Sequence, residues 1–218
     1  MSKPTILIDY DDTLLPTTFL EENGISLRTQ IKEDPELDSQ LKELDKEVRK
    51  FLKLCSKYGN PIILTNAETG WVKKSCLKFM PLTYKILSTI PIHSARERYS
   101  KIIKHPREWK KRLLIEDLES KILTHEFVIS IGDSEYERSA VMHFCKKHKN
   151  KIRSKNFLID ADVTRIESTT LVIKLLTLIL EYIILSKLEN DYVLSLNSAK
   201  STRNTPRKSQ KGVSPSYK

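Results

Sequence analysis

Short apolar runs alternate with longer polar segments along most of the chain. Three of these runs are rich in Ile, Val and Leu and end directly at polar residues, which is typical of buried strands. They are Thr5–Ile8 and residues 61–64 and 127–131. Residues 86–92 and 156–159 are predicted to be two further strands. The chain is therefore expected to build a β-sheet.

Between these runs, apolar residues recur every three or four positions, as they do on one face of an amphipathic helix. The clearest helical segment covers residues 37–58 and is closed by Gly59 and Asn60. Further helices are predicted over residues 70–79, 107–120 and 168–188, and from the residues after Asp133 to about residue 148. Because alternating strands and helices are joined by right-handed crossovers, the pattern predicts an α/β fold with a mainly parallel sheet covered on both faces.

The last predicted helix is densely apolar over residues 171–185. The apolar stretch is only about 15 residues long and carries Lys174 and Glu181, so it is too short and too charged for a good membrane span. We expect no membrane span here. The helix is expected to pack on the sheet or, in part, to lie at a dimer interface, and the sequence leaves the oligomeric state open.

Polar residues follow the three clearest strands directly. Asp9 and Asp11 come after the first, Thr65 after the second and Asp133 after the third. In open parallel sheets the chemistry lies outside the carboxyl ends of the strands, so these side chains are expected at one edge of the sheet. Taken alone, the acidic residues 9–12 could be a solvated turn.

The residues expected at this edge suit phosphoryl transfer. An ionised Asp9 can attack phosphorus and form an aspartyl-phosphate, while Asp11 can protonate the leaving oxygen and later deprotonate the attacking water. Thr65 can donate a hydrogen bond to a phosphate oxygen, and Lys110 can neutralise charge. Carboxylate oxygens are the ligands that Mg²⁺ prefers, and the predicted ligands are Asp9, Asp11, Asp133 and Glu137.

Three assignments are less specific than the others. Lys110 is preferred because it opens the helix ahead of the Asp133 strand, but other lysines compete with it: Lys73, Lys74, Lys101, Lys104 and Lys111. Asn66 and Arg96 are candidate substrate-binding residues, although each could equally cap a helix or pair with a surface carboxylate. With only five glycines and no Walker-type or GxGxxG loop, a dinucleotide or ATP cradle is not expected.

These motifs resemble the haloacid dehalogenase-like superfamily over residues 4–145. The segment 9–14 resembles its first motif, Thr65 its second, Lys110 its third and the segment 132–137 its fourth. The resemblance implies a Rossmann-like three-layer sandwich, Mg²⁺ and an aspartyl-phosphate intermediate in a phosphoric monoester hydrolase. One group of such proteins from unicellular eukaryotes, which is functionally uncharacterised, is similar in four segments: residues 65–71, 94–96, 106–110 and 132–138. Glu137 departs from the pattern, because many relatives have Asp there.

The intervals between the motifs indicate a minimal cap, because neither 14–60 nor 66–109 has room for a full cap domain. An open site favours a macromolecular phosphate, such as a phosphoprotein or a nucleic-acid end. The alternatives are a catalytically slow or inactive scaffold that serves as a binding module, and a small-metabolite phosphatase.

The formal charge of +10 is concentrated at one end of the chain. Six Lys or Arg and no acidic residue lie in residues 197–218, which are predicted to be a basic disordered tail behind a phosphohydrolase domain of residues 1–196. The tail could make weak contact with polyanions. Three scattered cysteines imply no disulfide framework, so a reducing compartment, cytoplasmic or nuclear, is expected.

Overall fold

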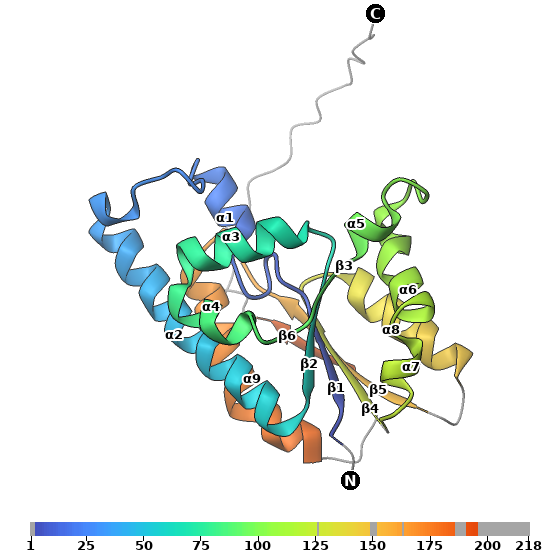
Figure 1. The fold of residues 1–218 in the computed structure, drawn as a ribbon. Helices are drawn as coiled ribbons and strands as arrows, with labels where there is room; N and C mark the ends of the chain where they lie inside the picture. Colours follow the sequence, from blue (N-terminus) through green and yellow to red (C-terminus); the bar gives the residue numbers. More distant parts are fainter. Residues whose placement is uncertain (1–2, 126, 149–151, 163, 186–190, 196–218) are drawn as a thin grey trace, which may run out of the picture.

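The structure is a computed structural model that describes residues 3–125, 127–148, 152–162, 164–185 and 191–195. One sheet lies at its centre, with strand order β3-β2-β1-β4-β5-β6 and every neighbouring pair parallel (Figure 1). The strands are β1 Thr5–Ile8, β2 Asn60–Thr65, β3 Ile92–Ser94, β4 Phe127–Gly132, β5 Arg153–Asp160 and β6 Asp191–Ser195. The predicted parallel sheet is confirmed.

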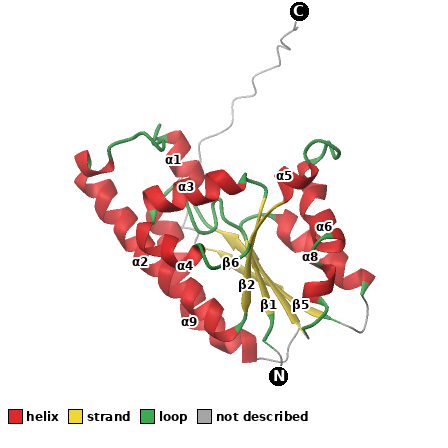
Figure 2. Ribbon diagram, in the orientation of Figure 1, coloured by secondary structure: helices red, strands yellow, loops and turns green. Residues whose placement is uncertain are grey.

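Helices cover both faces of this sheet (Figure 2). One face carries α1 Thr17–Glu22, α2 Pro35–Tyr58, α3 Thr69–Phe79, α4 Pro81–Leu87 and α9 Ile166–Leu185; the short 3₁₀ helix Ile31–Glu33 precedes α2. The other carries α5 Ala95–Tyr99, α6 Pro106–Glu116, α7 Glu119–Ile122 and α8 Glu135–Lys147. Because side chains alternate along a strand, Ile6 and Ile8 belong to the first core and Leu7 to the second. The predicted Rossmann-like three-layer sandwich is confirmed.

Apart from α2, which packs on the sheet, the segments before and after β2 contain only short elements. Residues 15–34 hold α1 and the 3₁₀ turn, and residues 66–105 hold α3, α4, β3 and α5. These segments leave the carboxyl edge of the sheet open, in agreement with the predicted minimal cap.

The strand predicted over residues 86–92 is wrong. Residues Pro81–Leu87 form α4, and the strand at that edge of the sheet is β3. The helix is fixed from a distance, because the buried carboxylate of Asp45 on α2 accepts the backbone N–H of Leu82 at 2.8 Å and that of Thr83 at 2.7 Å. A cap supplied by another helix leaves no signal in the local apolar pattern.

Loss of this distant cap should destabilise the fold. We expect Asp45→Ala to lower the free energy of unfolding by about 2–4 kcal/mol, because two backbone N–H groups lose a charged acceptor. Urea denaturation monitored by circular dichroism measures the difference. The control is Asp38→Ala on the same helix, whose carboxylate contacts the exposed Lys42 and should cost at most about 1 kcal/mol. Equal losses in the two variants would contradict the assigned role of Asp45.

Helix α9 packs on the sheet beside α2, as predicted. Its buried side chains include Val172, Leu176 and Leu180, which join the same core as the strands. By length and composition alone α9 would also qualify as a membrane-crossing helix. The predicted end of this helix, residues 186–188, and the predicted disordered tail, residues 197–218, lie outside the described residues.

Candidate active site

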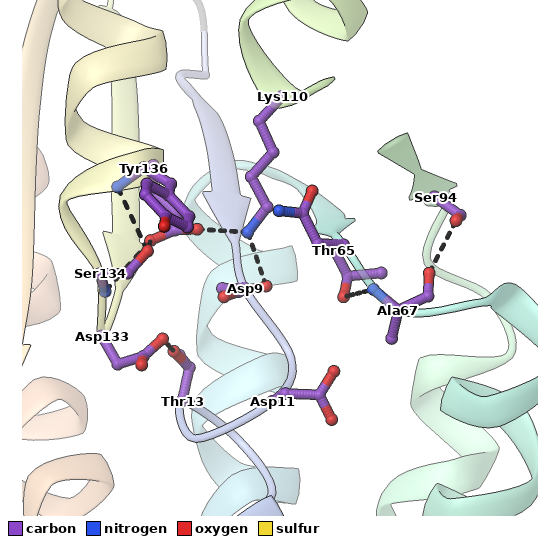
Figure 3. A network of polar contacts seen from close by, with 12 residues as sticks. Asp9, Asp11, Thr13, Thr65, Ala67, Ser94, Lys110, Asp133, Ser134 and Tyr136 are labelled. Carbon is purple, nitrogen blue, oxygen red and sulfur yellow. Dashed lines mark hydrogen bonds and ion pairs between the residues drawn. The ribbon is translucent and has the colours of Figure 1, made fainter. Parts of the chain in front are cut away.

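The chain turns sharply just after β1, and the turn brings two carboxylates to one cavity. Asp9 still pairs with β4 through its N–H, which donates to Ile131 O at 2.9 Å. Asp12 then takes a left-handed conformation with φ of 53°, and its carboxylate accepts the N–H and the hydroxyl of Thr18 at 2.8 and 2.6 Å. Successive side chains of a straight strand would point to opposite faces, whereas after this turn Asp9 and Asp11 both line the cavity (Figure 3).

Lys110 is the lysine that reaches Asp9. It lies in the first turns of α6, only 1% exposed, with its Nζ 2.9 Å from Asp9 Oδ1 and in contact with Glu137 Oε1. None of the five competing lysines lines the cavity. Burial disfavours the charged amine, but the carboxylates of Asp9 and Glu137 outweigh it and raise the pKa of Lys110 above its ordinary value.

Asp9, Asp133 and Glu137 form a buried carboxylate group. Each can offer one oxygen such that these oxygens all lie within 4.8 Å of one another. Burial, with the charges of Glu137 and Asp133, raises the pKa of Asp9 well above its ordinary value against the opposing effect of Lys110. Burial and Glu137 likewise raise the pKa of Asp133 to about 6. One lysine therefore does not balance three carboxylates, and this hard oxygen set suits a divalent cation such as Mg²⁺.

Asp11 is held apart from this group. Its Oδ1 accepts hydrogen bonds from Trp71 Nε1 at 2.9 Å and Thr17 Oγ1 at 2.6 Å, which orient the carboxylate in the cavity. Both bonds go to the same oxygen, so Oδ2 is available to carry a proton. Its carboxylate was predicted both as a proton carrier and as a metal ligand, and this geometry suits the first role.

Thr65 is fully buried at the end of β2, with its hydroxyl toward the cavity. The Ala67 N–H donates to Thr65 Oγ1 at 2.9 Å, so the hydroxyl hydrogen is left to donate to a phosphate oxygen. Ser94 was missed as a positioning residue: its hydroxyl donates to Ala67 O at 2.7 Å (Figure 3). The same hydroxyl accepts the Glu97 N–H at the start of α5. A Ser three residues before Glu is a helix-start signature that the sequence carries openly.

Glu137 is part of a capping box at the start of α8. Its Oε2 accepts the backbone N–H and the hydroxyl of Ser134, while Oε1 contacts Lys110. Burial acts to raise its pKa, but Lys110 and Ser134 together hold the pKa of Glu137 below its ordinary value. Gly132 makes room for this side chain, because a Cβ there would lie 2.7 Å from Glu137 Cγ. The longer arm of Glu thus spans from the helix start to Lys110.

The remaining predicted residues line the same cavity, which has a volume of about 550 Å³. Asn66 donates to Pro106 O at 3.4 Å, and Arg96 lies exposed at the rim. The structure thus brings all eight predicted site residues to one cavity, together with residues that were not predicted: Thr17, Trp71, Ser134 and Tyr136 among them. The indole N–H of Trp71 donates to the carboxylate of Asp11.

In comparisons with models of protein families, with curated proteins and with solved structures, nothing matches this chain. What the cavity does is therefore inferred from its own residues and their geometry.

Proposed function

We propose that the protein is a Mg²⁺-dependent phosphoric monoester hydrolase of the haloacid dehalogenase-like kind, with Asp9 as nucleophile. The observation that carries the proposal is the buried ion pair between Asp9 and Lys110, 2.9 Å long, beside two further carboxylates in an open cavity. A buried carboxylate next to one cation and to a site for a second is suited to attack an anionic phosphorus.

Each step of the proposed reaction uses a group already in place. An Asp9 oxygen attacks phosphorus, the bond from phosphorus to the ester oxygen breaks, and Asp11 gives that oxygen its proton. Asp11 then takes a proton from water, whose oxygen attacks the aspartyl-phosphate, releasing phosphate and restoring Asp9. Lys110 and Thr65 hold the phosphoryl oxygens throughout.

Asp9, Asp133 and Glu137 would hold the metal. Mg²⁺ supplies positive charge that screens the repulsion between the carboxylates and the substrate phosphate. The raised pKa values of Asp9 and Asp133 support this role, because burial and the neighbouring carboxylates disfavour their charged forms and Lys110 does not offset both effects.

Protons and Mg²⁺ should compete for Asp133. Its pKa is raised to about 6 in the metal-free protein, so below that pH a proton must leave before the metal binds. We expect the Kd for Mg²⁺, measured by calorimetry, to rise as the pH falls, with a break near pH 6 below which the proton on Asp133 adds about a further tenfold per pH unit. In Asp133→Asn the affinity should be lower and this break should disappear. A Kd that does not depend on pH would contradict the assignment.

The charges around the cavity bear on the substrate. Two exposed glutamates, Glu21 and Glu68, line the cavity on the solvent side, and among the described residues Arg96 is the one basic side chain there besides Lys110. A strongly anionic partner such as a nucleic-acid end meets repulsion at this rim. The open site and its acidic rim therefore favour a phosphoprotein over the other macromolecular phosphates. A small-metabolite phosphate remains the alternative substrate, and a slow or inactive scaffold the alternative function.

The test is a phosphatase assay with Mg²⁺ on an aryl phosphate, phosphopeptides, nucleotides and end-phosphorylated oligonucleotides. We expect turnover of the aryl phosphate, and a kcat/KM about fivefold higher for phosphopeptides with lysine flanks than with glutamate flanks. Glu21→Lys with Glu68→Lys should reverse that preference. No turnover across the panel, with no Mg²⁺ binding, would favour the scaffold. If nucleotides were turned over best, the proposed substrate class would be contradicted, but the proposed phosphatase activity would not.

A further inference from the structure

The outer face of α9 carries a stripe of exposed apolar side chains. Leu171, Leu178, Tyr182 and Leu185 are 48, 78, 71 and 63% exposed, and the half-buried Leu175 lies between the first two. The positions follow one another at intervals of four, three, four and three residues. On a helix this spacing forms one narrow stripe, and here it lies opposite the side chains that enter the core.

This spacing specifies the shape of the partner. Apolar residues that alternate at intervals of three and four form the seam of a coiled coil, in which each side chain enters a hole between residues of another helix. The partner that fits is therefore a helix with the same repeat, and α9 of a second copy supplies one. A two-fold axis would place the same stripe on both sides of the contact.

Charge complementarity fixes the direction of the pairing. Lys174 and Glu181 lie on the same flank of the stripe, seven residues apart. In an antiparallel pair these flanking positions face each other, so Lys174 meets Glu181 of the partner subunit, and the reverse contact forms by symmetry. A parallel pair would instead set Lys174 opposite Ile179, an apolar side chain that packs toward its own core.

We propose that two copies of this chain associate through α9, antiparallel about a two-fold axis. Leu171 then packs on Tyr182 of the partner subunit, and Leu175 on Leu178 of the partner subunit. Lys174 already lies 2.8 Å from Glu43 on α2, and its three N–H donors allow it to bind both carboxylates. Within the described part of the chain, Glu181 forms no ion pair as close as this one, although Lys57 lies near enough to interact with its charge.

A depression beside the stripe fits the end of the partner helix. It measures about 290 Å³, lies between α2 and α9, and includes Ile166, Thr170 and Leu171 in its lining. In the antiparallel register, Leu185 of the partner subunit lies beside Ser168, at the end of α9 that borders this depression. It lies on the same flank of the stripe as the depression. None of the stripe residues lines the active-site cavity, so the pairing leaves that cavity open.

Sedimentation velocity of the full chain over a concentration series tests the association. We expect the wild type to form a dimer and Leu178→Glu to remain a monomer with an unchanged circular dichroism spectrum. The control is Leu77→Glu on α3, also an exposed leucine at 55%, which should still dimerise. A wild type that stays monomeric would overturn the proposal, and binding of that monomer to lipid vesicles would assign the stripe to a membrane surface instead.

A charge exchange tests the antiparallel direction. Lys174→Glu alone and Glu181→Lys alone should each weaken dimerisation, because like charges then face each other. An equimolar mixture of the two variants should associate at least about tenfold more tightly than either alone, since both cross-contacts become attractive. A mixture that associates no better than the separate variants would rule out this pairing.

Discussion

Asp9→Asn should lower kcat on an aryl phosphate at least about 10³-fold at saturating Mg²⁺, since an amide cannot form the aspartyl-phosphate. The replacement has the same shape, and it leaves a polar oxygen near Lys110 Nζ, so the protein should fold. Steady-state kinetics and circular dichroism measure the two effects separately.

The control for Asp9 is its acidic neighbour Asp12. Its carboxylate accepts hydrogen bonds from Thr18 and has no assigned part in the reaction. Asn at this position can still accept the Thr18 N–H. Asp12→Asn should therefore lower kcat far less than Asp9→Asn does. Equal losses in the two variants would mean that the acidic turn acts only through its total charge.

Lys110→Met should abolish turnover and also destabilise the metal-free protein. Removal of the buried Lys110 ammonium leaves Asp9 and Glu137 without their cation, which we expect to cost about 3–5 kcal/mol of unfolding free energy. Saturating Mg²⁺ should recover a part of that loss, because it supplies positive charge to the same carboxylates. Urea denaturation with and without Mg²⁺ measures both quantities.

The matched control is the next residue on the helix, Lys111. It pairs with the half-exposed Glu108 at 2.8 Å and is not part of the cavity. Lys111→Met should change the unfolding free energy by less than about 1 kcal/mol and leave turnover intact. Destabilisation by Lys110→Met that Mg²⁺ does not relieve would contradict a metal site formed by these carboxylates.

The buried strands could be predicted because burial requires a characteristic amino-acid composition. A strand covered on both faces needs apolar side chains at successive positions, and Thr5–Ile8 has the observed bounds of β1. Among the elements that were not predicted, two have a clear physical reason. Helix α4 depends on a cap from Asp45, 37 residues away in sequence, and β6 is a short strand at the edge of the sheet.

The residues of the cavity were predictable because side chains just after parallel strands meet at one edge. The contacts that hold each of these side chains in place were not predictable. The bond from Trp71 to Asp11 joins residues 60 apart, and only the packing of α3 against the turn brings them together. The capping box of Ser134 and Glu137 is different, since Ser three residues before Glu after an apolar strand is a readable signal. It explains how Glu can occupy a position where Asp was expected.

A covalent phosphate on Asp9 is the most direct test of the proposed chemistry. The wild type is mixed with an aryl phosphate and Mg²⁺, quenched in acid, digested and examined by mass spectrometry. We predict a phosphate on the peptide that contains Asp9, removed by hydroxylamine and absent both without Mg²⁺ and in Asp9→Asn. Two results would contradict the mechanism: turnover by the wild type with no phosphate on Asp9, and full activity in the Asp9→Asn variant.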